Sequence, residues 1–166
     1  MIESIKNFFT SVVGPYWSVF ICSMIPIIEL RGAIPIGAFV KMHPLICYLI
    51  AVTGNMLPVP FVLLLIKKII ELFKKSKIKF LNKFANFLER RTEKNKDKVI
   101  KYGFWGIVIL VAIPLPGTGA WTGSLISALL DIPFWKAMLA VFVGVLIAGV
   151  AMLFISYGAS LLISLL

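Results

Sequence analysis

The chain has 166 residues, of which 60% are hydrophobic and only 14% are charged. An average globular protein carries about 25% charged residues, so this composition provides too little polar surface for a soluble protein of this size. Lipid is the solvent that accepts an apolar exterior. The composition therefore excludes an ordinary soluble domain and predicts an integral membrane protein with one compact domain.

The formal net charge of +10 is concentrated in one segment. Residues 67–101 hold 13 of the 17 Lys and Arg and 4 of the 7 Asp and Glu, which gives 13 − 4 = +9. A basic segment between long apolar ones follows the positive-inside rule, so we expect a cytoplasmic connector in a multi-pass protein of the inner (cytoplasmic) cell membrane. Its predicted partners are membrane lipids, and no nucleic-acid partner is expected.

The first half of the chain, residues 1–66, opens with short apolar segments. Residues 1–13 are predicted to form an interfacial helix that ends at Gly14-Pro15. The apolar residues 16–28 are too few to cross a hydrocarbon core of about 30 Å. A break follows at residues 29–37, which contain two charges, two glycines and a proline.

This break predicts a re-entrant hairpin, with residues 38–42 as its second arm, rather than a straight span. Residues 45–66 are apolar or uncharged and long enough to cross the membrane, with Asn55 at the middle. In the connector, apolar side chains gather on one face of residues 80–88, which predicts a second interfacial helix.

The second half, residues 102–166, repeats this order of segments. A short apolar run leads to a break rich in Gly and Pro, then to a short arm and a long apolar span, at residues 104–113, 114–124, 125–130 and 134–156. Aligning Pro44 with Pro133 places Asn55 on Gly144. The halves therefore form a repeat that is weak in sequence and clear in layout.

An odd number of crossings in each half would make the two halves inverted relative to each other. The predicted fold is an all-α polytopic membrane protein. It is an inverted repeat of a re-entrant helical hairpin plus a transmembrane helix, with an amphipathic connector between the halves. A plain bundle of four spans is the alternative.

Glu29 and Arg31 are the only charged residues in the segment 7–40. Burying either charge costs about 2.5–3.5 kcal/mol on insertion scales, and a buried pair costs less than two single charges. One interpretation places both at an interface, where they reach lipid headgroups. In the functional interpretation, Arg31 binds an anionic group while Glu29 orients Arg31 or takes a proton. Since residues i and i+2 face apart on a helix, this cooperation requires a broken chain, which Gly32 and Pro35 permit.

The second break predicts an anion site made of backbone amides. Thr118 is expected to cap a helix that begins near Gly119, which would leave several N–H groups facing a cavity, and Trp121 could line that cavity. Asn55 either bonds one helix to another or contacts a ligand. The complete predicted substrate-binding set is Arg31, Glu29, Gly32, Pro35, Asn55, Pro116, Gly117, Thr118, Gly119 and Trp121.

Sequence signatures of an enzyme are absent, and no catalytic residue, metal site or cofactor is predicted. Cys22 and Cys47 lie in separate apolar segments, where cysteine behaves as a small hydrophobe. Small residues at Ala140, Gly144 and Ala148 predict a close-packing seam. Such a seam could lie within one subunit or between two, so a homodimer is one state that the sequence allows.

Two motifs, Glu-Leu-Arg-Gly-Ala-Ile-Pro-Ile-Gly at 29–37 and Pro-Leu-Pro-Gly-Thr-Gly-Ala-Trp-Thr-Gly at 114–123, resemble those of the small multi-drug export protein family. The resemblance covers nearly the whole chain. The layout is also similar to the DedA group of membrane proteins, which have two re-entrant hairpins, two following spans and an amphipathic connector. The DedA likeness implies translocation of phosphorylated lipid carriers such as undecaprenyl phosphate, with proton coupling.

The leading functional hypothesis is a transporter or flippase for a small or lipid-linked anion, working by alternating access at a site between the two hairpin tips. One alternative is an exporter of cationic drugs that uses Glu29 and aromatic side chains. A second alternative is a membrane scaffold that transports nothing and recruits partners through its basic connector.

Overall fold

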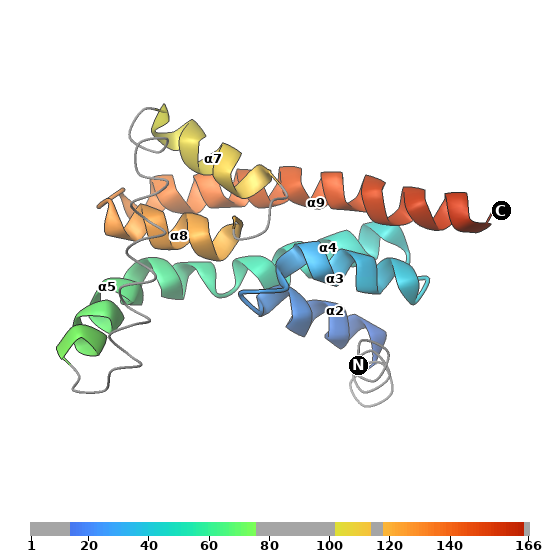
Figure 1. Ribbon diagram of the computed structural model, residues 1–166, viewed down its shortest axis with the longest axis horizontal. Helices are drawn as coiled ribbons and strands as arrows, with labels where there is room; N and C mark the ends of the chain where they lie inside the picture. The colour runs from blue at the N-terminus through green and yellow to red at the C-terminus, as the bar shows by residue number, and fades with distance from the viewer. Residues whose placement is uncertain (1–13, 76–101, 114–117, 165–166) are drawn as a thin grey trace. The chain divides into compact units, whose positions relative to one another are not determined.

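The computed structural model describes residues 14–75, 102–113 and 118–164, and the regular elements in these ranges are all α-helices (Figure 1). The predicted helices at 1–13 and 80–88 lie outside the described residues. The helices group into two compact units. Unit 1 comprises residues 1–57 and 145–166, and unit 2 comprises residues 58–144.

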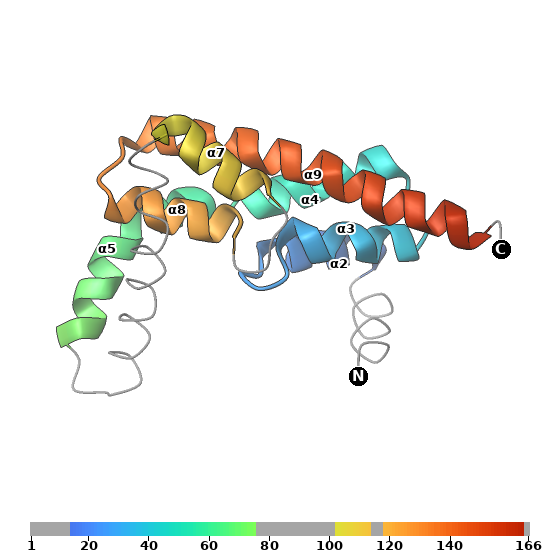
Figure 2. The same ribbon diagram turned by 45° about the horizontal axis from the view of Figure 1, so that its top comes forward.

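Each unit contains a pair of short helices and parts of both long apolar segments. In unit 1 the short helices α2 (Pro15–Met24) and α3 (Glu29–Phe39) pack on each other and on α4 (Pro44–Met56). In unit 2 the short helices are α7 (Phe104–Ala112) and α8 (Ala120–Leu129), and α8 also packs on α5 (Val59–Lys75). The long helix α9 (Phe134–Ser164), drawn in orange to red in Figures 1 and 2, contributes residues to both units.

The four short helices are too short to cross a bilayer. They contain between 9 residues, in α7, and 11 residues, in α3. At 1.5 Å per residue this gives about 14–17 Å, roughly half of a hydrocarbon core of about 30 Å. The structure therefore confirms that each half begins with two short helices, whereas the re-entrant path of each pair stays a prediction.

The predicted position of the first break is wrong and the second break is predicted too long, although a helix does begin near Gly119 as expected. In the first half the break covers residues 25–28 and α3 starts at Glu29, so residues 29–37 are helical rather than broken. The predicted second arm at 38–42 contains only the end of α3 and a turn. The predicted arm at 125–130 likewise starts too late, because α8 begins at Ala120.

Two helical segments have the length and composition of membrane spans, which confirms the long spans predicted from sequence. They are Pro44–Ile66, with 23 residues, and Phe134–Gly158, with 25 residues. Only a third of each span's most apolar window is buried. Large apolar side chains face outward, as at Phe61, which is 60% exposed, and Phe154, which is 78% exposed. Lipid is the environment in which such an apolar surface is stable.

The first span is interrupted, which the sequence analysis did not predict. The helix stops at Met56, turns at residues 57–58 and resumes as α5 at Val59. The cause is local, because Pro58 and Pro60 have no N–H group to donate. The carbonyl groups four residues earlier, those of Gly54 and Met56, therefore lose their usual helical donors.

The turns that end α3 and α8 have the same geometry. After α3, the amide of Lys41 donates to Ala38 O at 3.0 Å and the amide of Met42 donates to Gly37 O at 2.9 Å. After α8, the amide of Asp131 donates to Ala128 O and the amide of Ile132 donates to Ser127 O, at 3.3 and 3.0 Å. These bond pairs define Schellman caps, which satisfy carbonyls at the end of a helix.

The residue that reverses the chain in each cap has a positive φ, which is 56° at Lys41 and 57° at Asp131. Superposing the two caps pairs Lys41 with Asp131, so Gly54 rather than Asn55 corresponds to Gly144. The predicted alignment of Pro44 with Pro133 is therefore off by one residue.

Helix packing repeats in the same register. A Cβ added at Gly54 would lie 2.6 Å from Phe20 O and would also meet Ser23 Oγ, both in α2. A Cβ added at Gly144 would lie 2.6 Å from Val111 Cβ and 3.0 Å from Val108 O, both in α7. Phe20 and Ser23 precede Val108 and Val111 by the same 88 positions, so each of these glycines packs on a similar pair of positions in the first short helix of its half.

We expect Gly54→Ala to lower the thermal stability of the purified protein in detergent. A methyl group at position 54 has no room beside α2, and such overpacking costs about 1–3 kcal/mol, against a helix-propensity gain of about 1 kcal/mol. Gly158→Ala is the matched control, because nothing lies within 4 Å of a Cβ added there. The packing assignment fails if both variants unfold at the same temperature as wild type.

Candidate functional site

Glu29 combines three uncommon properties at the start of α3. Its side chain is only 4% exposed, its φ is 50°, and it is the first residue of the helix. A non-glycine residue in the left-handed region costs about 1–3 kcal/mol, and such strain is concentrated at functional sites. A carboxylate in the first turn is stabilised by the helix dipole, which offsets part of the cost of burying it.

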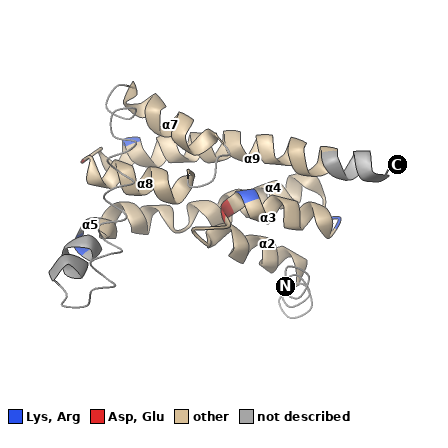
Figure 3. Ribbon diagram, viewed as in Figure 1, with Lys and Arg blue, Asp and Glu red and all other residues tan. Residues whose placement is uncertain are grey.

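Arg31 lies two residues further along α3 and is half-buried. Its guanidinium interacts electrostatically with the Glu29 carboxylate. On sequence grounds this cooperation requires a broken chain, whereas α3 is a continuous helix from Glu29 onward. The left-handed φ of Glu29 lies where the turn at residues 25–28 meets α3, so the break in the helix comes before the pair and not after it. In Figure 3 the start of α3 is coloured red and blue, which mark acidic and basic residues.

Gly32 and Pro35 also lie inside α3 rather than in a break. A Cβ added at Gly32 would meet the Ile28 side chain, so this glycine allows the turn before α3 to approach the helix. Pro35 cannot donate to the carbonyl of Arg31, which removes one helical bond from the first turn. Both residues therefore shape the surroundings of the Glu29–Arg31 pair.

At the second break, Thr118 does not have the role that the sequence predicts. Thr118 does not cap α8, because the N-cap residue is Gly119 and no side chain caps it. The Thr118 hydroxyl instead donates to Ile113 O at 2.9 Å, which ties the two ends of the break together. Gly119 has a φ of 134°, a conformation that favours glycine. Trp121 follows in the first turn of α8 and is half-buried.

Pro116 and Gly117 lie outside the described residues, so the predicted amide site stays a prediction. The other predicted residues fall into two groups, each described within its own unit. Glu29, Arg31, Gly32, Pro35 and Asn55 belong to unit 1, and Thr118, Gly119 and Trp121 belong to unit 2.

Four buried hydroxyl groups are satisfied inside their own helices. Each donates to a backbone carbonyl three or four residues earlier, at 2.6–2.8 Å, in Ser18, Ser23, Ser124 and Ser127. Such bonds remove the cost of burying a hydroxyl without any ligand. These serines therefore need no functional explanation.

Asn55 differs from these serines, because its amide remains unsatisfied. The residue is fully buried, and neither Oδ1 nor Nδ2 has a hydrogen-bond partner within the part of the chain that the structure describes. The Ser156 hydroxyl is the other such group there. A buried polar group without a partner costs about 1–3 kcal/mol. The interpretation of Asn55 as a hydrogen bond between helices has no support among the described contacts.

The packing register brings Asn55 to the level of Glu29. Cys47 on α4 lies against α3, where its thiol is 3.8 Å from Ile34 O and where a Cβ added at Gly37 would touch it. Because α3 and α4 are joined by a tight turn, they run antiparallel. Glu29 lies eight residues before Gly37, and Asn55 lies eight residues after Cys47. The two polar residues thus lie at the same end of unit 1.

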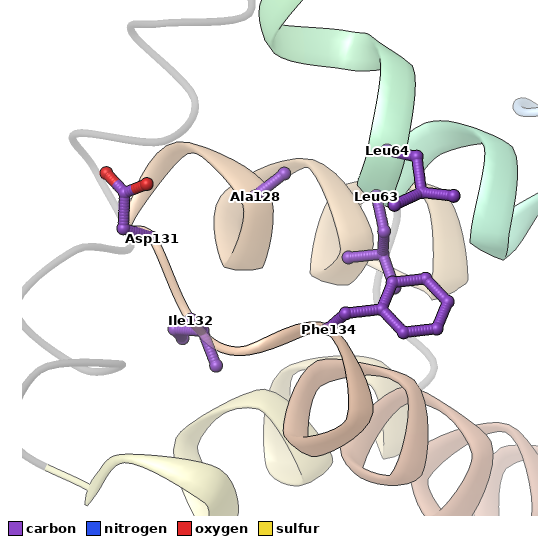
Figure 4. A pocket seen from close by; sticks show the side chains of 6 residues that line it. All are labelled: Leu63, Leu64, Ala128, Asp131, Ile132 and Phe134. Atoms are coloured by element: carbon purple, nitrogen blue, oxygen red, sulfur yellow. The ribbon is translucent and has the colours of Figure 1, made fainter.

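A separate pocket of about 200 Å³ lies within unit 2 (Figure 4). Its lining comes from α5 and from the turn between α8 and α9, and comprises Leu63, Leu64, Ala128, Asp131, Ile132 and Phe134. Figure 4 shows the Asp131 carboxylate on the opposite side of the pocket from the two leucines. The pocket is mostly apolar and contains no predicted site residue.

The two apolar spans and the short interrupted helices indicate a membrane protein. Residues 29–151 match the family described as "Putative small multi-drug export protein", and the chain belongs to this family. Neither the curated proteins nor the solved structures yield a match to this chain.

Proposed function

We propose that this protein is a membrane carrier for a small or lipid-linked anion, and that Arg31 is the group that binds the anion. The observation that carries the proposal is the charge pair at the start of α3. By sequence, Glu29 and Arg31 are the only charged residues in α2, α3, α4 and the part of α9 that belongs to unit 1. Ionisable residues in apolar helices are costly and are usually retained for function.

The two members of the pair have different environments, which suggests different roles. Glu29 is buried and is stabilised by the helix N-terminus, whereas Arg31 is half-exposed and can reach a ligand. A guanidinium binds carboxylate and phosphate groups through two parallel hydrogen bonds. Protonation of Glu29 would remove the charge that holds Arg31, which gives the carrier a route to proton coupling.

Transport needs a path, and the repeated short helices supply the elements for one. Interrupted helices within repeated halves are a common design for alternating access. The family description supports export as the direction. Undecaprenyl phosphate is the lipid-linked anion that we would test first, because the layout expected from the sequence is similar to that of the DedA group, for which translocation of phosphorylated lipid carriers is implied. The cationic exporter remains the rival, because Glu29 is the more buried charge of the pair.

We expect Arg31→Ala to weaken binding of undecaprenyl phosphate to the purified protein by at least about tenfold, because a hydrogen-bonded charge contributes about 1.5–3 kcal/mol. Native mass spectrometry or thermal shift would measure this loss. Lys41→Ala is the matched control, since it removes an exposed positive charge from the same unit and should leave binding unchanged.

Efflux from proteoliposomes distinguishes the anion carrier from the cation exporter. If Glu29→Gln abolishes efflux of a lipophilic cation such as ethidium while Arg31→Ala does not, the protein exports cations and the anion proposal is wrong. If neither change affects binding or efflux, and deletion of residues 94–98 removes the cellular phenotype, the scaffold interpretation is correct.

The proposed path also requires re-entrant hairpins and inverted halves. The pocket contacts support this arrangement within unit 2, because they bring the turn at Asp131 beside Leu63 and Leu64, near the basic end of α5. The turn after α8 would then lie on the same membrane side as the basic connector. In a bundle of four spans, the turns at Lys41 and Asp131 would both lie on the side opposite the connector.

Cysteine labelling tests this topology. In a background of Cys22→Ser and Cys47→Ala, we expect a membrane-impermeant maleimide to label Lys41→Cys from the outside and Asp131→Cys from the cytoplasmic side. Labelling of both positions from the outside would establish the bundle of four spans and would remove the basis for alternating access between inverted halves.

A further inference from the structure

Asn55 is a fully buried amide with both of its polar atoms unpartnered among the described residues, in a mostly apolar helix. Its position on α4 can be derived from its neighbours. Cys47 and Gly54 face α3 and α2, through contacts with Ile34 and Ser23. The opposite edge of the buried face contacts α9, since Tyr48 donates to Leu146 O at 3.2 Å and Val52 lies beside Gly149.

Asn55 follows Ala51 and Val52 by four and three residues, so it lies on the same helical face. Ala51 is fully buried, and Val52 is 7% exposed. Its amide therefore projects into the interior of unit 1, between the side of α4 that meets α2 and α3 and the side that meets α9.

The neighbouring turns of α4 and α2 contain several oxygen acceptors. Pro58 and Pro60 withdraw the donors for the carbonyls of Gly54 and Met56. At the same level α2 ends at Met24, and the last carbonyls of a helix carry partial negative charge. The Ser23 hydroxyl donates a hydrogen bond to Phe20 O, so the lone pairs of its own oxygen remain available as acceptors.

Two helix C-termini thus meet near Asn55, because Gly54 packs against the last turn of α2. The Glu29 carboxylate adds negative charge at the same level, partly balanced by Arg31. Oxygen atoms with little formal charge suit a monovalent hard cation, since Ca²⁺ requires 6–8 oxygen ligands, several of them carboxylates. Membrane carriers bind Na⁺ with the freed carbonyls and C-terminal ends of interrupted helices.

We propose that unit 1 contains a Na⁺ site in which Asn55 Oδ1 is a ligand, together with carbonyl oxygens at the interruption between α4 and α5. This site goes beyond the anion proposal and does not depend on it, because it requires neither Arg31 nor a transported anion. Na⁺ would then bind in the same unit as the Glu29–Arg31 pair.

The site predicts a Na⁺-specific stabilisation that can be measured without any substrate. We expect the melting temperature of the purified wild-type protein in detergent to rise saturably with NaCl, compared with KCl or choline chloride at equal ionic strength. The same preparations should bind radioactive ²²Na⁺ in a scintillation proximity assay, with saturation near one ion per chain.

Asn55→Leu keeps the volume of the side chain but removes the ligand, so it should abolish both responses while raising or preserving the melting temperature in choline chloride. Thr53→Val is the matched control, because its hydroxyl is exposed on the same helix and donates to Leu49 O. Asn55→Asp should lower the Na⁺ concentration at half-saturation, and it tests the site even if the leucine variant fails to fold.

A wild-type response that is equal in all three salts would overturn the proposal, as would a Na⁺ response that survives in Asn55→Leu. A melting temperature of Asn55→Leu that falls equally in every salt would assign Asn55 to helix packing. Retained Na⁺ binding in Arg31→Ala, combined with lost anion binding, would show that the Na⁺ site does not require the anion site.

Discussion

The structure depends on one constraint, which is that lipid cannot satisfy a backbone N–H or C=O group. Helices that stop inside the membrane must therefore satisfy their own ends. The Thr118 hydroxyl does so across the second break, and the caps after α3 and α8 satisfy carbonyls at the far ends of those helices with two backbone bonds each. Where a proline prevents this, as at Pro58, the freed carbonyls need another partner. The Na⁺ site proposed at Asn55 is based on these carbonyls.

Composition and periodicity were sufficient to predict a helical membrane protein with two long spans, because an apolar segment of over 20 residues has few other stable states. The order of short and long segments in the two halves was also predictable. The exact breaks were not. Pro35 and Gly32 suggested an interruption, yet both lie within α3, because a single proline removes only one helical bond and packing against neighbouring helices offsets that loss.

The candidate site was predictable in part, for a related reason. A charge pair in an apolar segment can be recognised in any sequence, and Glu29 and Arg31 were identified in this way. The left-handed φ of Glu29 and the αL turns at Lys41 and Asp131 have no such signal, because the sequence places no glycine there. The interruption beside Asn55 did have a signal, the pair Pro58 and Pro60, which the length of the surrounding apolar segment concealed.

The two halves share their backbone design but differ in their chemistry. Glu29 and Gly119 both have a positive φ where a helix starts, but Glu29 is the first residue of α3 with a φ of 50°, whereas Gly119 is the N-cap of α8 with a φ of 134°. Glycine adopts a positive φ at little cost, so the start of α8 carries neither strain nor charge. At the start of α3 the positive φ falls on a buried carboxylate, and Arg31 follows it.

Asn55 lies in this same half, whereas its counterpart by the corrected alignment is the apolar Val145, which is fully buried. The strained position, the charges and the unsatisfied amide are thus collected in unit 1. Apolar residues such as those at the corresponding positions of the second half would pack equally well. The proposed anion and Na⁺ sites would account for the cost of these features in unit 1.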